Sequence, residues 1–142
     1  MTRSEDEAAI QRVISQCSLP SGAADWDGLL ALYRPDGVWE IPHLGLRLEG
    51  HEAIRAALAG FTAVMDYVVQ LNAPAVIDID GDRATARSGI REAGKSRDKD
   101  EGFEYFGSYL DTLVRGAGGW QFEKRVFRHS GTHHFPLLPA AG

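Results

Sequence analysis

The sequence predicts an α+β fold in which helices come first and an antiparallel sheet follows. Two observations carry this prediction. Apolar residues recur at helical spacing in the first third of the chain, whereas most of the remainder alternates between apolar and polar residues at strand spacing. In addition, glycine-rich turns separate the alternating stretches, as expected of a meander of neighbouring strands.

The first helix is predicted to begin near Ser4, because Ser4 and Glu7 have the spacing of a capping box. An apolar stripe follows at three- and four-residue steps, and Pro20 and Gly22 are expected to end the helix. The stripe consists of Ile10, Val13, Ile14 and Cys17. Asp25 is placed to cap a second helix over 26–33, and a third is expected over 51–68, interrupted near Gly60.

Strands are predicted on both sides of the third helix. Residues 38–42 and 44–50 form a candidate hairpin, and residues 73–80 and 83–92 form a strand pair joined by a Gly-Asp turn. Two long strands are expected over 102–115 and 119–129. The charged stretch 91–102 is interpreted as a solvated hairpin loop, and residues 130–142 as a C-terminal tail that could fold over a pocket.

The size and charge of the chain limit what it could do. Its 142 residues fit a single domain over 1–142, and a net charge of −5 without a long basic run argues against nucleic acid as a partner. The charged N-terminus has no apolar signal region, so a cytoplasmic location without membrane contact is expected. Cys17 is the single cysteine, which excludes an internal disulfide and a multi-thiolate metal site.

Four stretches, in order, give the chain its resemblance to a known family. They read DWDGLLALYRPDGVWEI, LEGHEAIRAAL, VIDIDGDRATARS and GSYLDTLVRGAGGWQFEKRV. Together they resemble the SnoaL-like family of the nuclear transport factor 2-like superfamily. The resemblance implies a cone-shaped α+β barrel, in which N-terminal helices close a curved, mostly antiparallel sheet around a pocket. It also implies a homodimer or a higher homo-oligomer. Relatives include ketosteroid isomerases, scytalone dehydratases, dehydrochlorinases and simple binding domains, so the fold alone does not name a function.

Many such enzymes move protons with an Asp-His dyad, and this sequence departs from that pattern. Alignment without gaps places the aspartate position at Gly22 and the histidine position at Gln70. No histidine lies between His51 and His129, so a small shift does not restore the dyad. Gln70 cannot act as a base, but its amide could hydrogen-bond a substrate oxygen or satisfy a buried backbone group.

Strand alternation selects other candidates, because residues two apart share a face of the sheet. Tyr109 and Asp111 are the leading catalytic candidates: a buried tyrosine can donate to an oxyanion, and a desolvated aspartate can exchange protons near neutrality. The alternatives are a core aromatic for Tyr109 and an ion pair with Lys124 or Arg125 for Asp111. Between residues 102 and 115, these two share a face with Phe103, Tyr105, Gly107, Leu113 and Arg115; over 83–92 the inward set is Ala84, Ala86, Ser88, Ile90 and Glu92.

Among the five histidines, His129 is the candidate proton carrier, since it follows the last strand. Adjacent histidines at 133 and 134 are a weak metal signal, so neither metal nor cofactor is predicted. Catalysis is therefore assigned to Tyr109, Asp111, Gln70 and His129. Substrate binding is assigned to Trp26, Tyr33, Trp39, Met65, Ile90, Tyr105 and Arg115.

The sequence thus favours a cofactor-independent lyase or isomerase. Its substrate would be a bulky, hydrophobic, oxygenated small molecule such as an aromatic or polycyclic compound, because large apolar side chains are predicted to wall the pocket. The alternative is a non-catalytic binding or accessory domain that kept the fold and lost the dyad.

Overall fold

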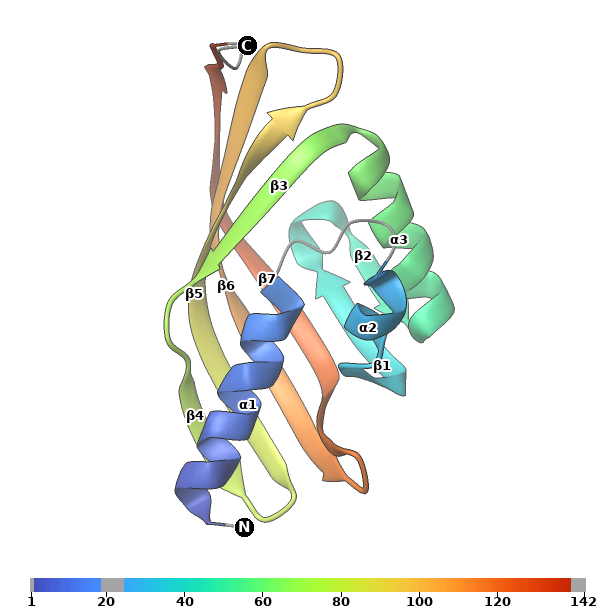
Figure 1. Cartoon of the computed structure of the whole chain (residues 1–142), viewed down its shortest axis with the longest axis vertical. Coiled ribbons are helices and arrows are strands. Elements are labelled where there is room, and N and C mark those ends of the chain that lie inside the picture. Colours follow the sequence, from blue (N-terminus) through green and yellow to red (C-terminus); the bar gives the residue numbers. More distant parts are fainter. Residues whose placement is uncertain (1, 19–24, 139–142) are drawn as a thin grey trace.

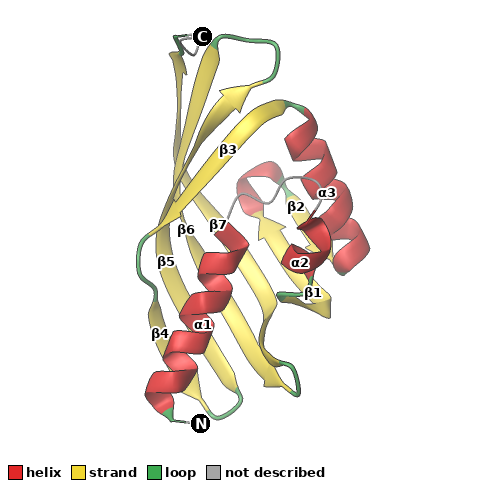
Figure 2. Cartoon of the chain, viewed as in Figure 1, coloured by secondary structure: helices red, strands yellow, loops and turns green. Residues whose placement is uncertain are grey.

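The structure is a computed structural model that describes residues 2–18 and 25–138 (Figure 1). Its helices are α1 (Arg3–Ser18), α2 (Trp26–Leu30), the short 3-10 helix η2 (Pro42–Leu44) and α3 (His51–Ala63). Its strands are β1 (Tyr33–Ile41), β2 (Leu46–Glu49), β3 (Met65–Asn72), β4 (Val76–Asp80), β5 (Arg83–Ser96), β6 (Glu101–Gly116) and β7 (Gly119–Pro136). The order of elements confirms the α+β prediction (Figure 2).

The strands form one curved sheet of seven strands in the order β2-β1-β7-β6-β5-β3, and β4 also pairs with β5. The β1–β7 pair is parallel and the other pairs are antiparallel. β3 and β4 share the same edge of β5, since β4 pairs with its first half and β3 with its second. The sheet is curved but does not close into a barrel, and the three α-helices lie on one side of it (Figure 1).

The core lies between α1 and the concave face of the sheet. Ile10, Val13 and Ile14 are buried, as their spacing predicts, and they belong to one cluster with Leu113 and Phe122. Removing each such side chain from water contributes about 1.5–3 kcal/mol. The predicted inward face of β5 is also confirmed, because Ala84, Ala86, Ser88 and Ile90 are buried while the residues between them are exposed.

The start of α1 differs from the prediction. The capping box is formed by Thr2 and Glu5 instead of Ser4 and Glu7: the Thr2 hydroxyl accepts from the Glu5 backbone N–H, and the Glu5 carboxylate accepts from the Thr2 N–H. The spacing is the same, so the first turn begins two residues earlier. Pro20 and Gly22, which were expected to end the helix, lie outside the described residues.

Two helices are shorter than predicted. α2 ends at Leu30 and Tyr33 already belongs to β1, whereas the third helix runs through Gly60 and ends at Ala63. Residues 65–68, expected to continue that helix, instead begin β3 (Met65–Asn72), which pairs with β5. Their β-branched and aromatic side chains suit a strand, and the long second half of β5 offers the edge that this strand needs.

The last three strands are longer than predicted. β5 continues to Ser96 and β6 begins at Glu101, so the expected loop shrinks to residues 97–100. β7 continues to Pro136, and residues 131–136, interpreted from sequence as part of a tail, pair with residues 101–106 of β6. Antiparallel pairing satisfies the backbone groups of both segments, and this outweighs their polar composition.

Within residues 2–18 and 25–138, no helix combines the length and the apolar character needed to cross a membrane.

Gly94 on β5 is predicted to be necessary for the packing of β3. A Cβ atom there would overlap the backbone carbonyl of Tyr67 and the ring of Phe103, whereas a Cβ at Gly89 on the same strand would meet nothing within 4 Å. We expect Gly94→Ala to lower the free energy of unfolding by about 1–3 kcal/mol. Gly89→Ala, the matched control, should change it by no more than about 0.5 kcal/mol. Urea denaturation measures both, and equal effects would contradict the close approach of β3.

Candidate active site

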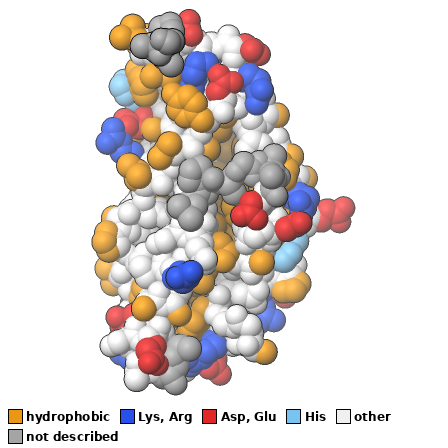
Figure 3. Space-filling view, viewed as in Figure 1, with side chains coloured by type: hydrophobic (Ala, Val, Ile, Leu, Met, Phe, Trp, Pro, Cys, Tyr) orange, Lys and Arg blue, Asp and Glu red, His pale blue; other side chains and the backbone are white. Residues whose placement is uncertain are grey.

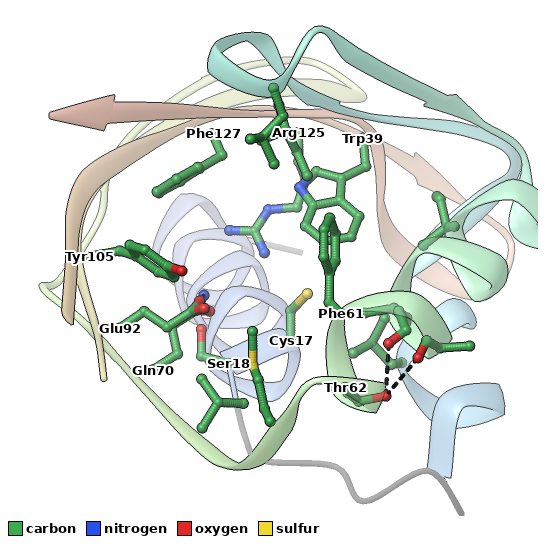
Figure 4. A pocket seen from close by; sticks show the side chains of 18 of the residues that line it. Cys17, Ser18, Trp39, Phe61, Thr62, Gln70, Glu92, Tyr105, Arg125 and Phe127 are labelled. Carbon is green, nitrogen blue, oxygen red and sulfur yellow. Dashed lines mark hydrogen bonds between the residues drawn. The ribbon is translucent and has the colours of Figure 1, made fainter. Parts of the chain in front are cut away.

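A pocket of about 890 Å³ lies between the concave face of the sheet and the helices. Its volume falls within the range of about 300–1,000 Å³ that is usual for small-molecule sites. A strip of hydrophobic side chains is visible between α1 and the side of α2 and α3 (Figure 3). Aromatic and aliphatic residues from α1, α2, α3, β1, β3, β6 and β7 form most of the wall, with a few polar side chains among them (Figure 4).

Most of the residues selected from sequence line this pocket. Those that do are Trp26, Tyr33, Trp39, Met65, Gln70, Tyr105, Tyr109 and His129. They come from five separate elements, α2, β1, β3, β6 and β7, which the fold brings around one space.

Three selected residues lie outside the pocket lining, namely Asp111, Ile90 and Arg115. Ile90 is buried in the sheet. Arg115 lies at the end of β6, where its guanidinium binds Asp6 (2.5 Å) and Asp82 (3.0 Å) and lies 5.0 Å from the Trp120 ring. Strand alternation placed Arg115 on the correct face of β6. However, β6 is 16 residues long, and α1 covers the part of this face that contains Arg115.

Asp111 forms a buried ion pair with Arg125, one of the two partners considered from sequence. Arg125 Nε donates to Oδ1 at 2.8 Å and Nη2 donates to Oδ2 at 3.2 Å, and both side chains are almost fully buried. Lys124, the other partner considered, binds Glu40 instead. Burial raises the pKa of Asp111, and the nearby Arg125 charge opposes that shift. The aspartate thus faces Arg125 and not the pocket space.

Arg125 itself lines the pocket, although sequence reasoning did not select it as a site residue. Its guanidinium lies 3.8 Å from the centroid of the Tyr109 ring and 4.4 Å from that of Phe122. The ion pair and these two rings fix its orientation, because a bidentate contact and cation–π packing both constrain the plane of the group. The pocket therefore holds a cation whose charge is balanced by Asp111 from outside the pocket.

A row of polar side chains crosses four strands on the pocket side of the sheet. Gln70 on β3 is paired with Glu92 on β5, Glu92 with Tyr105 on β6, and Tyr105 with Thr132 on β7. All four residues line the pocket. The amide Nε2 of Gln70 donates to Oε2 of Glu92 at 2.8 Å, and Tyr105 lies on the other side of the carboxylate (Figure 4).

Glu92 is the titratable carboxyl group of this row. Burial raises its pKa above the ordinary value of 4.5, and the hydrogen bond from Gln70 partly offsets the shift. The pKa of Tyr105 is also raised, by burial and then by the neighbouring Glu92. A carboxyl group with a raised pKa inside an apolar cavity is suited to exchange protons with a ligand. Sequence reasoning placed Glu92 on the inward face but gave it no role; a carboxylate continuing that apolar face was the available signal.

His129 reaches the same pocket from β7. Its Nε2 lies 2.6 Å from the hydroxyl of Thr132, and its ring stacks on that of His43 with 4.3 Å between centroids. The pKa of His43 is lowered by burial and by the neighbouring His129. The polar row therefore continues from Thr132 into a pair of imidazoles.

Of the two positions where the resemblance places the Asp-His dyad, the structure describes one. Gln70 does lie in the pocket, where it binds Glu92. Gly22 lies outside the described residues. Among the residues that the structure does describe, no group of three or more His, Cys, Asp or Glu side chains is arranged to hold a metal ion.

A curved open sheet with helices over an interior pocket is a fold of the nuclear transport factor 2-like type. More narrowly, the chain belongs to the SnoaL-like family, whose model matches residues 2–126. The comparison with curated proteins finds no match.

Solved structures show the same fold at low sequence identity. A hexachlorocyclohexane dehydrochlorinase (LinA) of type 2 superposes with a TM-score of 0.85 at 17% identity, over 99% of this chain and 95% of the other. A protein of Novosphingobium aromaticivorans provisionally named a scytalone dehydratase gives 0.79 at 21%, over 98% and 95%. Another protein of that organism, provisionally named an aromatic ring hydroxylase, gives 0.83 at 21%, over 95% and 96%.

The buried ion pair predicts a pattern of stabilities. Asp111→Leu leaves Arg125 buried without its partner and should lower the free energy of unfolding by about 3–5 kcal/mol. Replacing both residues, Asp111→Leu with Arg125→Met, should cost less than the single change, because no uncompensated charge remains. Urea denaturation of the two variants and the wild type measures the difference. A double variant less stable than Asp111→Leu would contradict the pairing as the main role of Asp111.

Proposed function

We propose that this protein is a cofactor-independent lyase or isomerase that transfers protons on a bulky, hydrophobic, oxygenated small molecule. The observation that carries the proposal is Glu92, a carboxyl group with a raised pKa that faces a large apolar pocket and is held by Gln70. The SnoaL-like membership supports it, since the resemblance includes lyases and isomerases of this kind. The substrate class rests on the aromatic walls.

Glu92 would act as the general base. In its ionised form the carboxylate removes a proton from a carbon next to a carbonyl group, and the raised pKa makes it a stronger base than an exposed glutamate. Because Gln70 binds Oε2, Oε1 is the oxygen that would accept the proton. Gln70 thus positions the base without itself transferring a proton.

Two further side chains would complete the reaction. Burial raises the pKa of Tyr109 far above its ordinary value, so its hydroxyl stays protonated and can donate a hydrogen bond to a substrate oxygen. In an isomerisation, Glu92 returns the proton to another carbon. In an elimination, His129 protonates the leaving group, and Glu92 keeps the proton taken from carbon until product release.

Binding without catalysis is the second candidate function. It is favoured by Gln70, a side chain that cannot act as a base, at the position where the resemblance places the catalytic histidine. The two candidates differ in one measurable property, which is whether a bound ketone exchanges its acidic C–H protons.

Exchange of the α-protons of 2-tetralone into D₂O, followed by NMR, tests the proposal. We expect the wild type to accelerate exchange and Glu92→Gln to reduce the acceleration by about 100-fold or more, the usual contribution of a general base. Glu104→Gln is the matched control, because Glu104 is a buried carboxylate on β6 that binds Arg91 and does not line the pocket. Binding of 2-tetralone without exchange would favour the binding function, and equal rates for wild type and Glu92→Gln would exclude Glu92 as the base.

The exchange rate should also depend on pH in a defined direction. Glu92 acts as a base only when ionised, so the rate should rise as the pH rises through its raised pKa and then level off. A rate that falls over the same range would contradict this role.

The free energy of unfolding should depend on the same titration of Glu92, but it should fall as the pH rises. Because the pKa of Glu92 is higher in the folded state, the folded protein binds more protons, and wild-type stability decreases as the pH rises from about 4.5 through the folded pKa. Glu92→Gln lacks this group and should become more stable relative to wild type over that window. Urea denaturation of both proteins between about pH 4 and about pH 8 measures the difference. Parallel stability curves would show that the pKa is not raised.

A further inference from the structure

The pocket wall contains a hydrogen-bond donor without a partner. The indole Nε1–H of Trp39 is buried, and no acceptor in residues 2–18 and 25–138 lies within hydrogen-bond distance of it. Trp39 itself lines the pocket and packs edge-on against Phe61. Buried donors are almost always satisfied in folded proteins, so an unpaired one beside a ligand cavity points to an acceptor that the protein does not supply.

The neighbour of this indole is also a donor. Trp39 and Arg125 are paired residues on the parallel strands β1 and β7, and their side chains lie beside each other at the pocket wall (Figure 4). A guanidinium has five N–H groups and no acceptor, so Arg125 cannot satisfy Trp39. Two donors side by side require an acceptor from elsewhere.

Asp111 leaves one edge of the guanidinium for that acceptor. Its two oxygens take Nε and Nη2, and no oxygen of the described residues accepts a hydrogen bond from Nη1. Cys17 on α1 lies near the same group, but a thiol is a weak acceptor. The ion pair therefore holds Arg125 in place while Nη1 keeps its capacity to donate.

We propose that Trp39 and Arg125 form an oxygen-binding subsite that takes the carbonyl, enolate or phenolate oxygen of the ligand. This inference rests on the proposed function, because the subsite would hold the oxygen on which charge develops when Glu92 removes a proton. A fixed indole N–H and a fixed cation stabilise such an oxygen without reorganising during the reaction. The ligand class is thus narrowed to hydrophobic ring compounds with a carbonyl or hydroxyl oxygen that becomes an enolate or phenolate when a proton is removed.

The electrostatics of the pocket favour a single oxygen over a full carboxylate. Asp111 balances the charge of Arg125 from behind, so the subsite presents two donors with little net charge. A neutral carbonyl that becomes an enolate during the reaction matches such a site better in its transition state than in its ground state.

The test compares naphthalene, 2-naphthol and 2-tetralone as ligands of the wild type, Trp39→Phe and Trp26→Phe. Trp26→Phe is the matched control, since Trp26 lines the pocket from α2. Calorimetry gives the affinities, and the three indole N–H signals in ¹H–¹⁵N spectra report on Trp26, Trp39 and Trp120 separately. Trp120 serves as an internal reference because its Nε1–H already donates to Asp6 at 3.0 Å.

We expect the wild type to bind the two oxygenated compounds about threefold to tenfold more tightly than naphthalene, the effect of one hydrogen bond. Trp39→Phe should reduce this preference, because only one of the two donors of the subsite remains, while keeping the affinity for naphthalene; Trp26→Phe should retain the full preference. The Trp39 N–H signal of the wild type should move further with 2-naphthol than with naphthalene. This last measurement needs no variant, so it holds even if Trp39→Phe folds poorly.

The opposite outcomes separate the subsite from the proposed function. Binding of all three compounds with equal affinity, or an unchanged preference in Trp39→Phe, would overturn the subsite and leave the role of Glu92 to the exchange experiment. Failure of all three compounds to bind at their solubility limits would overturn the ligand class and, with it, both proposals.

Discussion

The register of β5 against β6 is the constraint on which the pocket depends. These strands pair over thirteen consecutive positions, from Arg83 with Val114 to Lys95 with Gly102. Because side chains alternate between faces, a slip of one residue would turn Glu92 and its neighbours away from the pocket. The same register aligns Glu92 with Gln70 on one side and with Tyr105 on the other. Backbone pairing thus positions Glu92, the proposed acid–base group, and Gln70 binds one of its oxygens.

Asp111 illustrates how burial alone does not identify a catalytic carboxylate. Asp111 and Glu92 are both desolvated, and both have raised pKa values. Both oxygens of Asp111 accept hydrogen bonds from Arg125, whereas Glu92 accepts one from the neutral amide of Gln70 and faces the cavity. A carboxylate paired with a guanidinium is stabilised in its ionised form. A carboxylate that receives a hydrogen bond from a neutral amide lacks the stabilisation of a neighbouring positive charge, so its pKa stays raised and it can exchange a proton with a ligand. The partner, more than the depth, separates the two roles.

The pocket distributes its polar groups in two places. The first is the row from Gln70 to Thr132, which crosses β3, β5, β6 and β7 and continues into His129 and His43. The second is the pair of Trp39 and Arg125, which lies where β1 meets β7. Apolar and aromatic side chains fill much of the remaining wall. A ligand that reaches both places must combine a hydrophobic body with an oxygen, which agrees with the substrate class inferred from the walls.

The sequence by itself determined the class of fold, the apolar stripe of α1 and the inward face of β5, because period and alternation are local properties. It also identified part of the pocket lining, since Tyr105 and Tyr109 lie on a face that alternation identifies. The end of α3 and the existence of β3 were decided only by the tertiary structure: residues 65–72 become a strand because β5 offers them an edge. The same holds for the partners of Asp111, Glu92 and Trp39, which come from other strands, and no spacing within one strand reveals them. Contacts between strands therefore decide which carboxylate is paired with a guanidinium and which with an amide.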